Sequence, residues 1–394
     1  MKKMVLTLIL LINCTLIIAK NIGPTSNLKF KTILNAPVRR IGLSQLKGKI
    51  VIIEFWATWC APCIDAMSHL KQLQKKYPHK LQIIAVTDET VSRTMQYLRF
   101  QPSNLWFAID TDRAIANIFP HRIIPHTVLI GRDGKLIANT SPELISGRII
   151  DSLWNKRHVH IPQKKDNLSG PEELVKQYFF AQDTVKNRFI MQTEIKGALT
   201  VSTTHFSDSI FNGRRLFCVN LSIQTLYNIA FGGFSSNRII DCSKKSINEP
   251  SYCLDLIVEN KADLLPTLQK ELLNRFDLKA KIESKLKDVY VLTVTDLGKL
   301  RRIPLNTSNI RTYNSSHGKI DQQAITMDEF ADYLENYGVR NLSVVNETNQ
   351  HDKFDIKFSF QPEDPASLTR VLDNLGLGLK KEQREINFLL LYNP

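Results

Sequence analysis

The ten residues EFWATWCAPC, at positions 54–63, place two cysteines two residues apart directly after an apolar run. That run, residues 50–55 (IVIIEF), has the length and continuous apolar character of a buried central strand. Beyond Cys63, apolar side chains recur at helical spacing, at Ile64, Met67, Leu70 and Tyr77. Pro62 then falls in the first turn of a helix, where proline is tolerated. The sequence therefore predicts that the cysteine pair joins a buried strand to a helix N-terminus.

Strand and helix patterns continue to alternate as far as Trp154. Strands are predicted at 81–86, 105–109, 127–130 and 135–138, and helices at 91–100, 114–119 and 145–154. A glycine-containing turn at 131–134 returns the last strand antiparallel. The pattern indicates an α/β domain with a central mixed sheet flanked by helices.

The position of Cys60 favours a reactive thiolate. The positive end of the helix dipole and the free N–H groups at a helix N-terminus stabilise a negative charge. Cys60 is therefore the candidate nucleophile, and Cys63, nearly one turn further on, is placed to resolve a mixed disulfide. Glu54 lies on the preceding strand between apolar neighbours. A carboxylate buried there can take and return the proton of Cys63, and its alternative, a strand-end acid in solvent, fits the apolar flanks less well.

Residues 25–158 resemble the thioredoxin superfamily, and above all its exported TlpA/ResA-like thiol–disulfide oxidoreductases. The motif FWATWCAPC carries the resemblance, together with RIIPHTVLIGRDGKL at 122–136. The resemblance implies a cis-proline at Pro125 beside the disulfide, and backbone groups of Ile124 that hydrogen-bond to a substrate strand. Trp59 and His126 are further candidates for substrate contact. His126 departs from the small polar residue usual after the proline, and its imidazole either acts on the nearby thiolate or, as the simpler interpretation, points to solvent.

Other interpretations of the cysteine pair fit less well. A zinc site needs further Cys or His ligands at suitable spacing, and the sequence places none nearby. A structural disulfide needs neither paired tryptophans nor a buried acid nor a downstream proline. A peroxidase relative with the same fold would show a Thr-x-x-Cys context, which is missing. The redox-active Cys60–Cys63 disulfide is thus the one reactive group expected, with no metal and no other cofactor.

The N-terminal residues predict export. A basic start, a short apolar run at 4–19 and the small Ala19 have the order of a secretory signal peptide at 1–19. The run is shorter than the roughly 20 residues of a spanning helix, so an uncleaved anchor is the weaker alternative. Lipidation of Cys14 is a second alternative, although Asn13 fits a lipoprotein signal poorly. We expect a soluble protein of the bacterial periplasm or cell envelope, without stable membrane insertion after cleavage.

Length and composition predict two globular domains. The chain has 394 residues, of which 43% are hydrophobic and 23% charged, and this exceeds one ordinary domain. The net charge of +14 comes from scattered lysines and arginines, without a basic helix interleaved with aromatics. A nucleic-acid partner is therefore not expected. The expected partners are protein dithiols or disulfides of the cell envelope and, by the resemblance, a membrane-bound electron donor.

Two further segments follow the redox domain. Residues 159–195 are predicted as a linker and a bridging helix, because a polar stretch with Pro and Gly precedes a helical pattern over 174–189. Region 196–394 shows a faint duplication with a period near 100 residues, in which LSIQTLYNIAF from Leu221 corresponds to ITMDEFADYLE from Ile325. Each half is predicted as helix, strand, helix and two strands. The region is therefore predicted to be an α+β domain, and two pseudo-repeats are our interpretation of the duplication.

Region 196–394 resembles an uncharacterised exported bacterial domain family and shows no chemistry of its own. No nucleophile–base pair, phosphate loop or metal cluster is recognisable in its sequence. Two hypotheses follow. In the first, the protein is a thiol–disulfide oxidoreductase, a reductase by the resemblance and by the lack of histidine between its cysteines. In the second, it is a binding or envelope-structural protein whose redox domain is accessory.

Three cysteines lie outside the motif. Cysteines of exported proteins tend to pair, and Cys242 and Cys253 bracket a polar loop, so we expect a structural disulfide between them. Cys218, in the apolar run RLFCVNL, is expected to be a buried free thiol. A bond from Cys218 to either of the others, and servicing of such a bond by the redox pair, stay open as alternatives.

Overall fold

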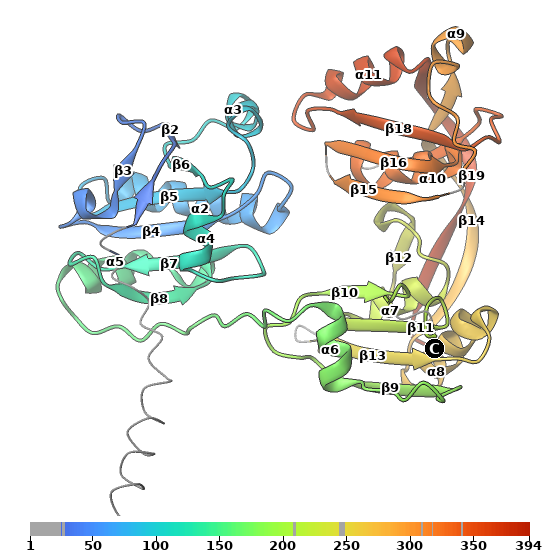
Figure 1. The fold of residues 1–394 in the computed structure, drawn as a ribbon, viewed down its shortest axis with the longest axis horizontal. Coiled ribbons are helices and arrows are strands. Elements are labelled where there is room, and N and C mark those ends of the chain that lie inside the picture. The colour runs from blue at the N-terminus through green and yellow to red at the C-terminus, as the bar shows by residue number, and fades with distance from the viewer. Residues whose placement is uncertain are drawn as a thin grey trace, which may run out of the picture. The chain divides into compact units, whose positions relative to one another are not determined.

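The computed structural model describes residues 25, 28–207, 210–243, 249–308, 310–316, 318–339 and 342–394. Two compact units divide the chain, Met1–Lys165 and Asp166–Pro394 (Figure 1). The predicted signal peptide at 1–19 lies outside the described residues. Of the helices within the described ranges, none combines the length and the apolar character needed to cross a bilayer.

The first unit is built on a six-stranded mixed sheet in the order β2-β6-β5-β4-β7-β8. Its central strand, β4, runs parallel to β5 and antiparallel to β7. All six residues of β4 are buried, as its apolar sequence predicts. A separate ladder pairs β1 with β3. The strands are β1 (Lys29–Phe30), β2 (Ile33–Leu34), β3 (Ile41–Gly42), β4 (Ile50–Phe55), β5 (Leu81–Thr87), β6 (Trp106–Ile109), β7 (His126–Ile130) and β8 (Leu136–Thr140).

Helices cover both faces of this sheet. One face packs against α2, α3 and α5, in the core cluster that also contains both motif cysteines. The other face is covered by α4 and the short 3-10 helix η2. The bounds are η2 (Leu43–Leu46), α2 (Ala61–Lys76), α3 (Val91–Phe100), α4 (Ala114–Ile118), η3 (Pro142–Leu144) and α5 (Gly147–Trp154). The predicted mixed sheet with flanking helices is confirmed.

Residues 161–164 belong to the first unit, which corrects the prediction of a linker from residue 159. Ile161 is buried in the core cluster around α2. The Lys164 N–H donates to the Asn139 carbonyl at 2.8 Å, and the Asn139 N–H donates to Gln163 Oε1 at 3.0 Å. Because Asn139 lies in β8, these bonds hold the segment against that strand.

The second unit begins before the predicted boundary at residue 196. The helix expected over 174–189 is instead α6 (Pro171–Tyr178), followed by strand β9 (Arg188–Thr193). β9 pairs with β13 over all six of its residues, and a helix continuing to residue 189 would lose part of this ladder. Leu174 and Val175 of α6 are buried against the sheet β10-β11-β13-β9.

The two halves of the second unit share one order of elements. In each half two strands, a helix, a short strand, a further strand, a second helix and a long strand follow one another. The first half comprises β10 (Val201–Thr203), β11 (Arg215–Leu221), α7 (Ile223–Ala230), η4 (Ser236–Arg238), β12 (Ile239–Asp241), β13 (Tyr252–Ile257), η5 (Lys261–Asp263), α8 (Leu264–Arg275) and β14 (Lys279–Val294). The second comprises α9 (Leu297–Leu300), β15 (Thr312–Ser316), β16 (Lys319–Ile325), α10 (Met327–Tyr333), the π-helix η6 (Leu334–Gly338), β17 (Ser343–Asn346), β18 (Phe354–Ser359), α11 (Pro365–Asn374) and β19 (Leu377–Tyr392).

The long strands tie the halves together. β14 and β19 pair antiparallel along all 16 residues of each strand, forming the long ribbon seen in Figure 1. β12 of the first half pairs with β19, and β17 of the second half pairs with β14. Each short strand therefore pairs with the long strand of the other half. The predicted α+β fold is confirmed, although each half ends on one long strand where two were expected.

The structure contradicts the expected disulfide between Cys242 and Cys253. Both are free thiols, Cys242 exposed at the end of β12 and Cys253 buried in β13. The Cys253 Sγ instead donates to Asn220 Oδ1 at 3.3 Å. The buried free thiol expected at Cys218 is confirmed, and burial raises its pKa to about 12. Cys218 and Cys253 belong to core clusters on opposite faces of their sheet, so they do not pair either.

Candidate redox site

Cys60 and Cys63 form a disulfide at the N-terminus of α2. Their Sγ atoms are 2.00 Å apart and their Cα atoms 5.2 Å apart. Cys60 is the N-cap of the helix, and its Sγ accepts the Cys63 N–H at 3.3 Å. Of the two, Cys60 keeps 5% of its surface exposed and Cys63 none, so an incoming sulfur reaches Cys60 first. Trp59, next in the chain, is 54% exposed and gives the site an aromatic rim.

Glu54 is fully buried on the disulfide side of the sheet. In β4 it shares a face with Ile52 and Trp56, which belong to the same core cluster as both cysteines. Thr127 Oγ1 donates to Glu54 Oε2 at 2.5 Å, whereas Oε1 has no hydrogen-bond partner among the described residues. Burial raises the pKa of Glu54 to about 8, although the Thr127 hydrogen bond and the charge of Lys164 lower it in part. Near neutral pH this carboxyl can therefore both hold and release a proton.

The buried carboxyl should make stability depend on pH in a defined direction. The pKa of Glu54 is about 8 in the fold against its ordinary value of 4.5, so the folded state binds the extra proton. Stability from this group is therefore present below pH 4.5 and is lost as pH rises through 8. The difference amounts to at most about 5 kcal/mol, at 1.36 kcal/mol per pKa unit. Urea unfolding of the oxidised protein at pH 5 and pH 9, followed by tryptophan fluorescence, measures it.

Two variants separate this effect from other titrations. Glu54→Gln should remove most of the decline between the two pH values, because a neutral amide replaces the titrating group. Asp133→Asn changes an exposed carboxylate of the same unit and should leave the decline as in the wild type. An unchanged decline in Glu54→Gln would show that another group causes it.

The loop before β7 places a proline at the same end of the sheet. The Ile124–Pro125 peptide bond is cis, as the resemblance implies. Phe55 pairs with His126, so Pro125 lies just beyond the end of β4 from which the chain enters the cysteine motif. Ile124 packs against the core clusters on both faces of the sheet. The structure thus brings together four of the predicted site residues, namely Glu54, Cys60, Cys63 and Pro125.

The structure contradicts the simpler interpretation of His126, in which its imidazole points to solvent. Its side chain is buried, not solvent-facing. It stacks on His121 with ring centroids 4.7 Å apart and contacts Phe55 at 5.9 Å. Phe55 points to the sheet face opposite Glu54 and the disulfide, so the His126 imidazole belongs to that far face. The His126 ring is thus part of a buried aromatic group with His121 and Phe55.

Two residues of the site were not identified from the sequence. Glu89, after β5, accepts the Thr58 N–H at 2.7 Å and the Thr58 hydroxyl at 2.8 Å, and so fixes the loop before the cysteines. Lys164 donates to the carbonyls of Ile123 and Pro125. Both approach from segments distant in the chain, and neither belongs to a motif of fixed spacing.

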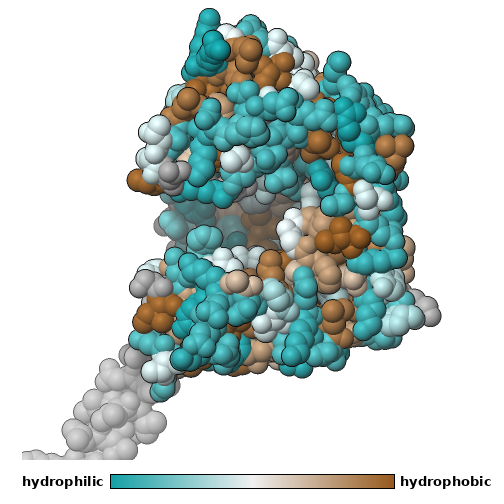
Figure 2. All heavy atoms as spheres, turned by 90° about the vertical axis from the view of Figure 1, so that its right-hand side faces the viewer, coloured by the Kyte–Doolittle hydropathy of each residue, from teal (hydrophilic) through white to brown (hydrophobic). Residues whose placement is uncertain are grey.

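The described residues of the second unit offer a different kind of site. On the face shown in Figure 2, hydrophilic side chains predominate and apolar ones gather in small separate groups, which is ordinary for a protein surface.

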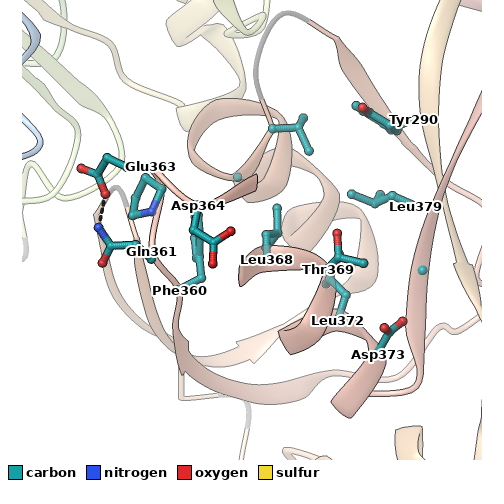
Figure 3. Close-up of a pocket in the computed structure, with 14 residues that line it drawn as sticks. Tyr290, Phe360, Gln361, Glu363, Asp364, Leu368, Thr369, Leu372, Asp373 and Leu379 are labelled. Carbon is teal, nitrogen blue, oxygen red and sulfur yellow. Dashed lines mark hydrogen bonds between the residues drawn. The ribbon is translucent and has the colours of Figure 1, made fainter. Parts of the chain in front are cut away.

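A cavity of about 380 Å³ lies between α11 and the β14–β19 ribbon (Figure 3). Figure 3 shows Leu368 and Leu372 of α11 facing Tyr290 and Leu379 of the ribbon. The cavity is therefore largely apolar on these sides.

Three carboxylates also line this cavity, at Glu363, Asp364 and Asp373. Asp364 caps the N-terminus of α11 and pairs with Arg370 at 2.6 Å, as expected for a helix-start acid. Among the described residues that line the cavity there is no histidine, lysine, serine or cysteine. Within the described ranges, no group of three or more His, Cys, Asp or Glu side chains is placed to hold a metal ion. The cavity thus combines apolar walls with carboxylate side chains.

Comparison with known proteins agrees with the two units. Residues 24–139 match the AhpC/TSA family, and residues 247–392 match a family described as a protein of unknown function, DUF3738. "Thiol-disulfide oxidoreductase ResA" of Bacillus cereus is 35% identical over 101 residues, which are 25% of this chain and 58% of the relative. ResA of Bacillus subtilis (strain 168) is 29% identical over 117 residues, 29% of this chain and 63% of the relative. The chain thus spans about three-fifths of the length of these relatives.

Among solved structures, a "putative thiol-disulfide oxidoreductase" from Bacteroides vulgatus is 26% identical, with a TM-score of 0.29. The match covers 34% of this chain and 99% of that one. The expected likeness to ResA-like proteins and to an uncharacterised domain family is confirmed by the sequence relatives and the family matches. The chain therefore carries a thioredoxin-like domain at 24–139, followed by a DUF3738 domain.

Proposed function

We propose that the protein is an exported thiol–disulfide oxidoreductase that reduces disulfides of cell-envelope proteins through Cys60 and Cys63. The observation that carries the proposal is the disulfide at the N-terminus of α2 with the buried, protonatable Glu54 on the same face of the sheet. The names of the sequence relatives support the reaction class. Export is supported by the signal-like order of residues 1–19.

The reaction begins from the reduced Cys60–Cys63 pair. The Cys60 thiolate attacks one sulfur of a substrate disulfide, so a mixed disulfide forms and the other substrate sulfur leaves as a thiolate. Glu54 then takes the proton of Cys63, and the Cys63 thiolate attacks Cys60 Sγ. The second substrate sulfur leaves, and the proton on Glu54 becomes available to it. The substrate gains two electrons, and the protein ends with the disulfide present in the structure.

Substrate selection is assigned to groups around the disulfide. Trp59 offers an exposed indole beside Cys60, and the backbone of Ile124 lies at the end of the sheet where an extended substrate strand can add hydrogen bonds. Return to the reduced state needs an external dithiol, for which we propose a membrane-bound donor. The proposed extents are 25–158 for the redox domain, with Ile161–Lys164 docked on it, and 166–394 for the second domain.

A second candidate function is binding by the second unit, with the redox domain as an accessory. The cavity of about 380 Å³ between α11 and the β14–β19 ribbon favours it. On this view the second unit carries the main role itself, whereas under the enzymatic proposal it recruits the proteins that the cysteine pair reduces.

Insulin reduction by dithiothreitol tests the enzymatic proposal. The full chain should accelerate the precipitation of the insulin B chain at catalytic, substoichiometric concentration. A parallel assay with a hydroperoxide as the oxidant should show no turnover, because the Thr-x-x-Cys context of a peroxidase is missing. A folded protein without turnover in the insulin assay would leave the binding function as the better proposal.

The reduction potential decides the direction of electron flow. We expect a value nearer that of thioredoxin, roughly −270 mV, than that of DsbA, roughly −120 mV. The Ala-Pro dipeptide between the cysteines and the resemblance to TlpA-like reductants support this expectation. Equilibration of the full chain with glutathione buffers, followed by thiol alkylation, measures the potential. A value near that of DsbA would reassign the protein as an oxidant.

A further inference from the structure

The segment after α5 returns to the redox site. Ile161 is buried in the core cluster that holds both cysteines. Pro162 O accepts the Thr140 hydroxyl at 2.8 Å, and the Lys164 N–H donates to Asn139 O at 2.8 Å. These bonds attach the segment to β8, whose neighbour β7 follows the cis-proline loop directly.

The side chain of Lys164 ends at that loop. Its Nζ donates to Ile123 O at 2.5 Å and to Pro125 O at 3.0 Å. A lysine ammonium has three donors, so one side chain holds the carbonyls on both sides of Ile124. The loop is thereby fixed around the residue whose backbone is expected to meet the substrate.

The same ammonium acts on Glu54. Its positive charge lowers the pKa of Glu54 and so opposes the effect of burial. The other groups that act on Glu54 are the Thr127 hydroxyl of β7, which also lowers its pKa, and the Glu143 carboxylate of η3, which raises it. Lys164 is thus the cation among these groups, and its charge favours the ionised form of the buried carboxyl.

We propose that Lys164 is a positioning residue for thiol–disulfide exchange. Its ammonium holds the loop around Ile124 and supplies the positive charge that favours the ionised form of Glu54, the form that takes the proton from Cys63. This role rests on the proposed oxidoreductase function. It gives residues 161–164, at the end of the first unit, a role in the redox site.

The test compares full-length proteins by the pH dependence of insulin reduction between pH 5 and 9. Lys164→Met removes the charge at similar length, and Lys164→Arg retains it. Lys165→Met is the matched control, because Lys165 is the neighbouring lysine and is exposed. The wild type must first show turnover, since inactive wild-type protein would refute the proposed function and not this inference.

In Lys164→Met the rising limb of the rate profile should move to higher pH by about one unit, which lowers the rate about tenfold on that limb. Lys164→Arg and Lys165→Met should keep the wild-type limb. In the Glu54→Gln background, Lys164→Met should no longer move the limb. A wild-type profile for Lys164→Met, or a loss of rate that is equal at every pH, overturns the proposal. If Lys164→Met fails to fold, Lys164→Gln takes its place under the same criteria.

Discussion

Replacing Cys60 by serine should abolish disulfide exchange, whereas replacing Cys63 by serine should trap mixed disulfides with the natural substrates. Without the Cys60 sulfur no mixed disulfide can form, because Cys63 is fully buried. With Cys60 alone, attack still occurs but resolution stops. Insulin turnover should fall to the uncatalysed rate in both variants. Non-reducing gels and mass spectrometry of cells expressing Cys63→Ser should identify the trapped proteins.

The exposed thiol elsewhere in the chain supplies a matched control. Cys242→Ser removes a sulfur of the second unit and should change neither turnover nor the trapped proteins. If Cys60→Ser accumulates adducts and Cys63→Ser does not, the roles of the two cysteines are reversed. Adducts that disappear with Cys242→Ser would assign the trapping to that exposed thiol.

Replacing Asp255 by alanine should destabilise the second unit by about 3–5 kcal/mol, the cost of breaking a buried ion pair. Asp255 is fully buried in β13 and accepts Arg215 Nε at 2.6 Å and Arg188 Nη2 at 2.5 Å. Both guanidinium groups also donate to Phe179 O, at the end of α6. Without the carboxylate, two cations would stay among apolar neighbours without a counter-charge.

The distribution of tryptophan makes this measurable within the full chain. All four tryptophans, at 56, 59, 106 and 154, lie in the first unit. Urea unfolding followed by fluorescence should therefore be unchanged in Asp255→Ala. The part of the far-ultraviolet circular dichroism transition that tryptophan fluorescence does not follow should move by roughly 2 M urea, for a slope of about 2 kcal/mol/M.

Glu259→Ala is the matched control for a charge pair on the same part of the sheet. Glu259 pairs with Lys186 at 2.7 Å, but both side chains are at least half exposed. Exposed pairs contribute up to about 1 kcal/mol, so this variant should move the transition little. Equal shifts in the two variants would mean that burial of the Asp255 cluster adds no stability.

The first unit could be predicted from sequence because its signals are local. The apolar run at 50–55, the helical spacing after Cys63 and the turn at 131–134 each specify an element without reference to distant residues. The redox pair and the buried acid follow from residues 54–63, whereas the cis-proline is expected only from the resemblance carried by residues 122–136. The helix predicted at 91–100 matches α3 residue for residue.

The errors fall where distant contacts decide the outcome. Lys164 hydrogen-bonds to residues 39 and 41 positions away in the sequence, and Glu89 to a residue 31 positions away. No sequence motif of fixed spacing predicts such contacts. Arg188 and Phe189, expected at the end of the bridging helix, belong instead to strand β9, because β9 pairs with β13. Cys242 and Cys253 bracket a loop in sequence, yet their strands belong to different sheets. A polar loop between two cysteines does not indicate whether the strands on either side of it belong to the same sheet.

The exchange of short strands between the halves of the second unit has a consequence for how this unit folds. β12 and β19, and β17 and β14, can pair only when both halves are present, and Glu335, from the second half, binds Arg238, from the first, at 2.6 Å. Neither half can complete its sheet as an independent folding nucleus. Contacts so distant in sequence slow the search for the native topology, and they make unfolding a single event. A fragment cut at the family match, which begins at residue 247, would lose the strands β9, β10, β11 and β12 and the ladders that they form, whereas the whole unit Asp166–Pro394 retains them.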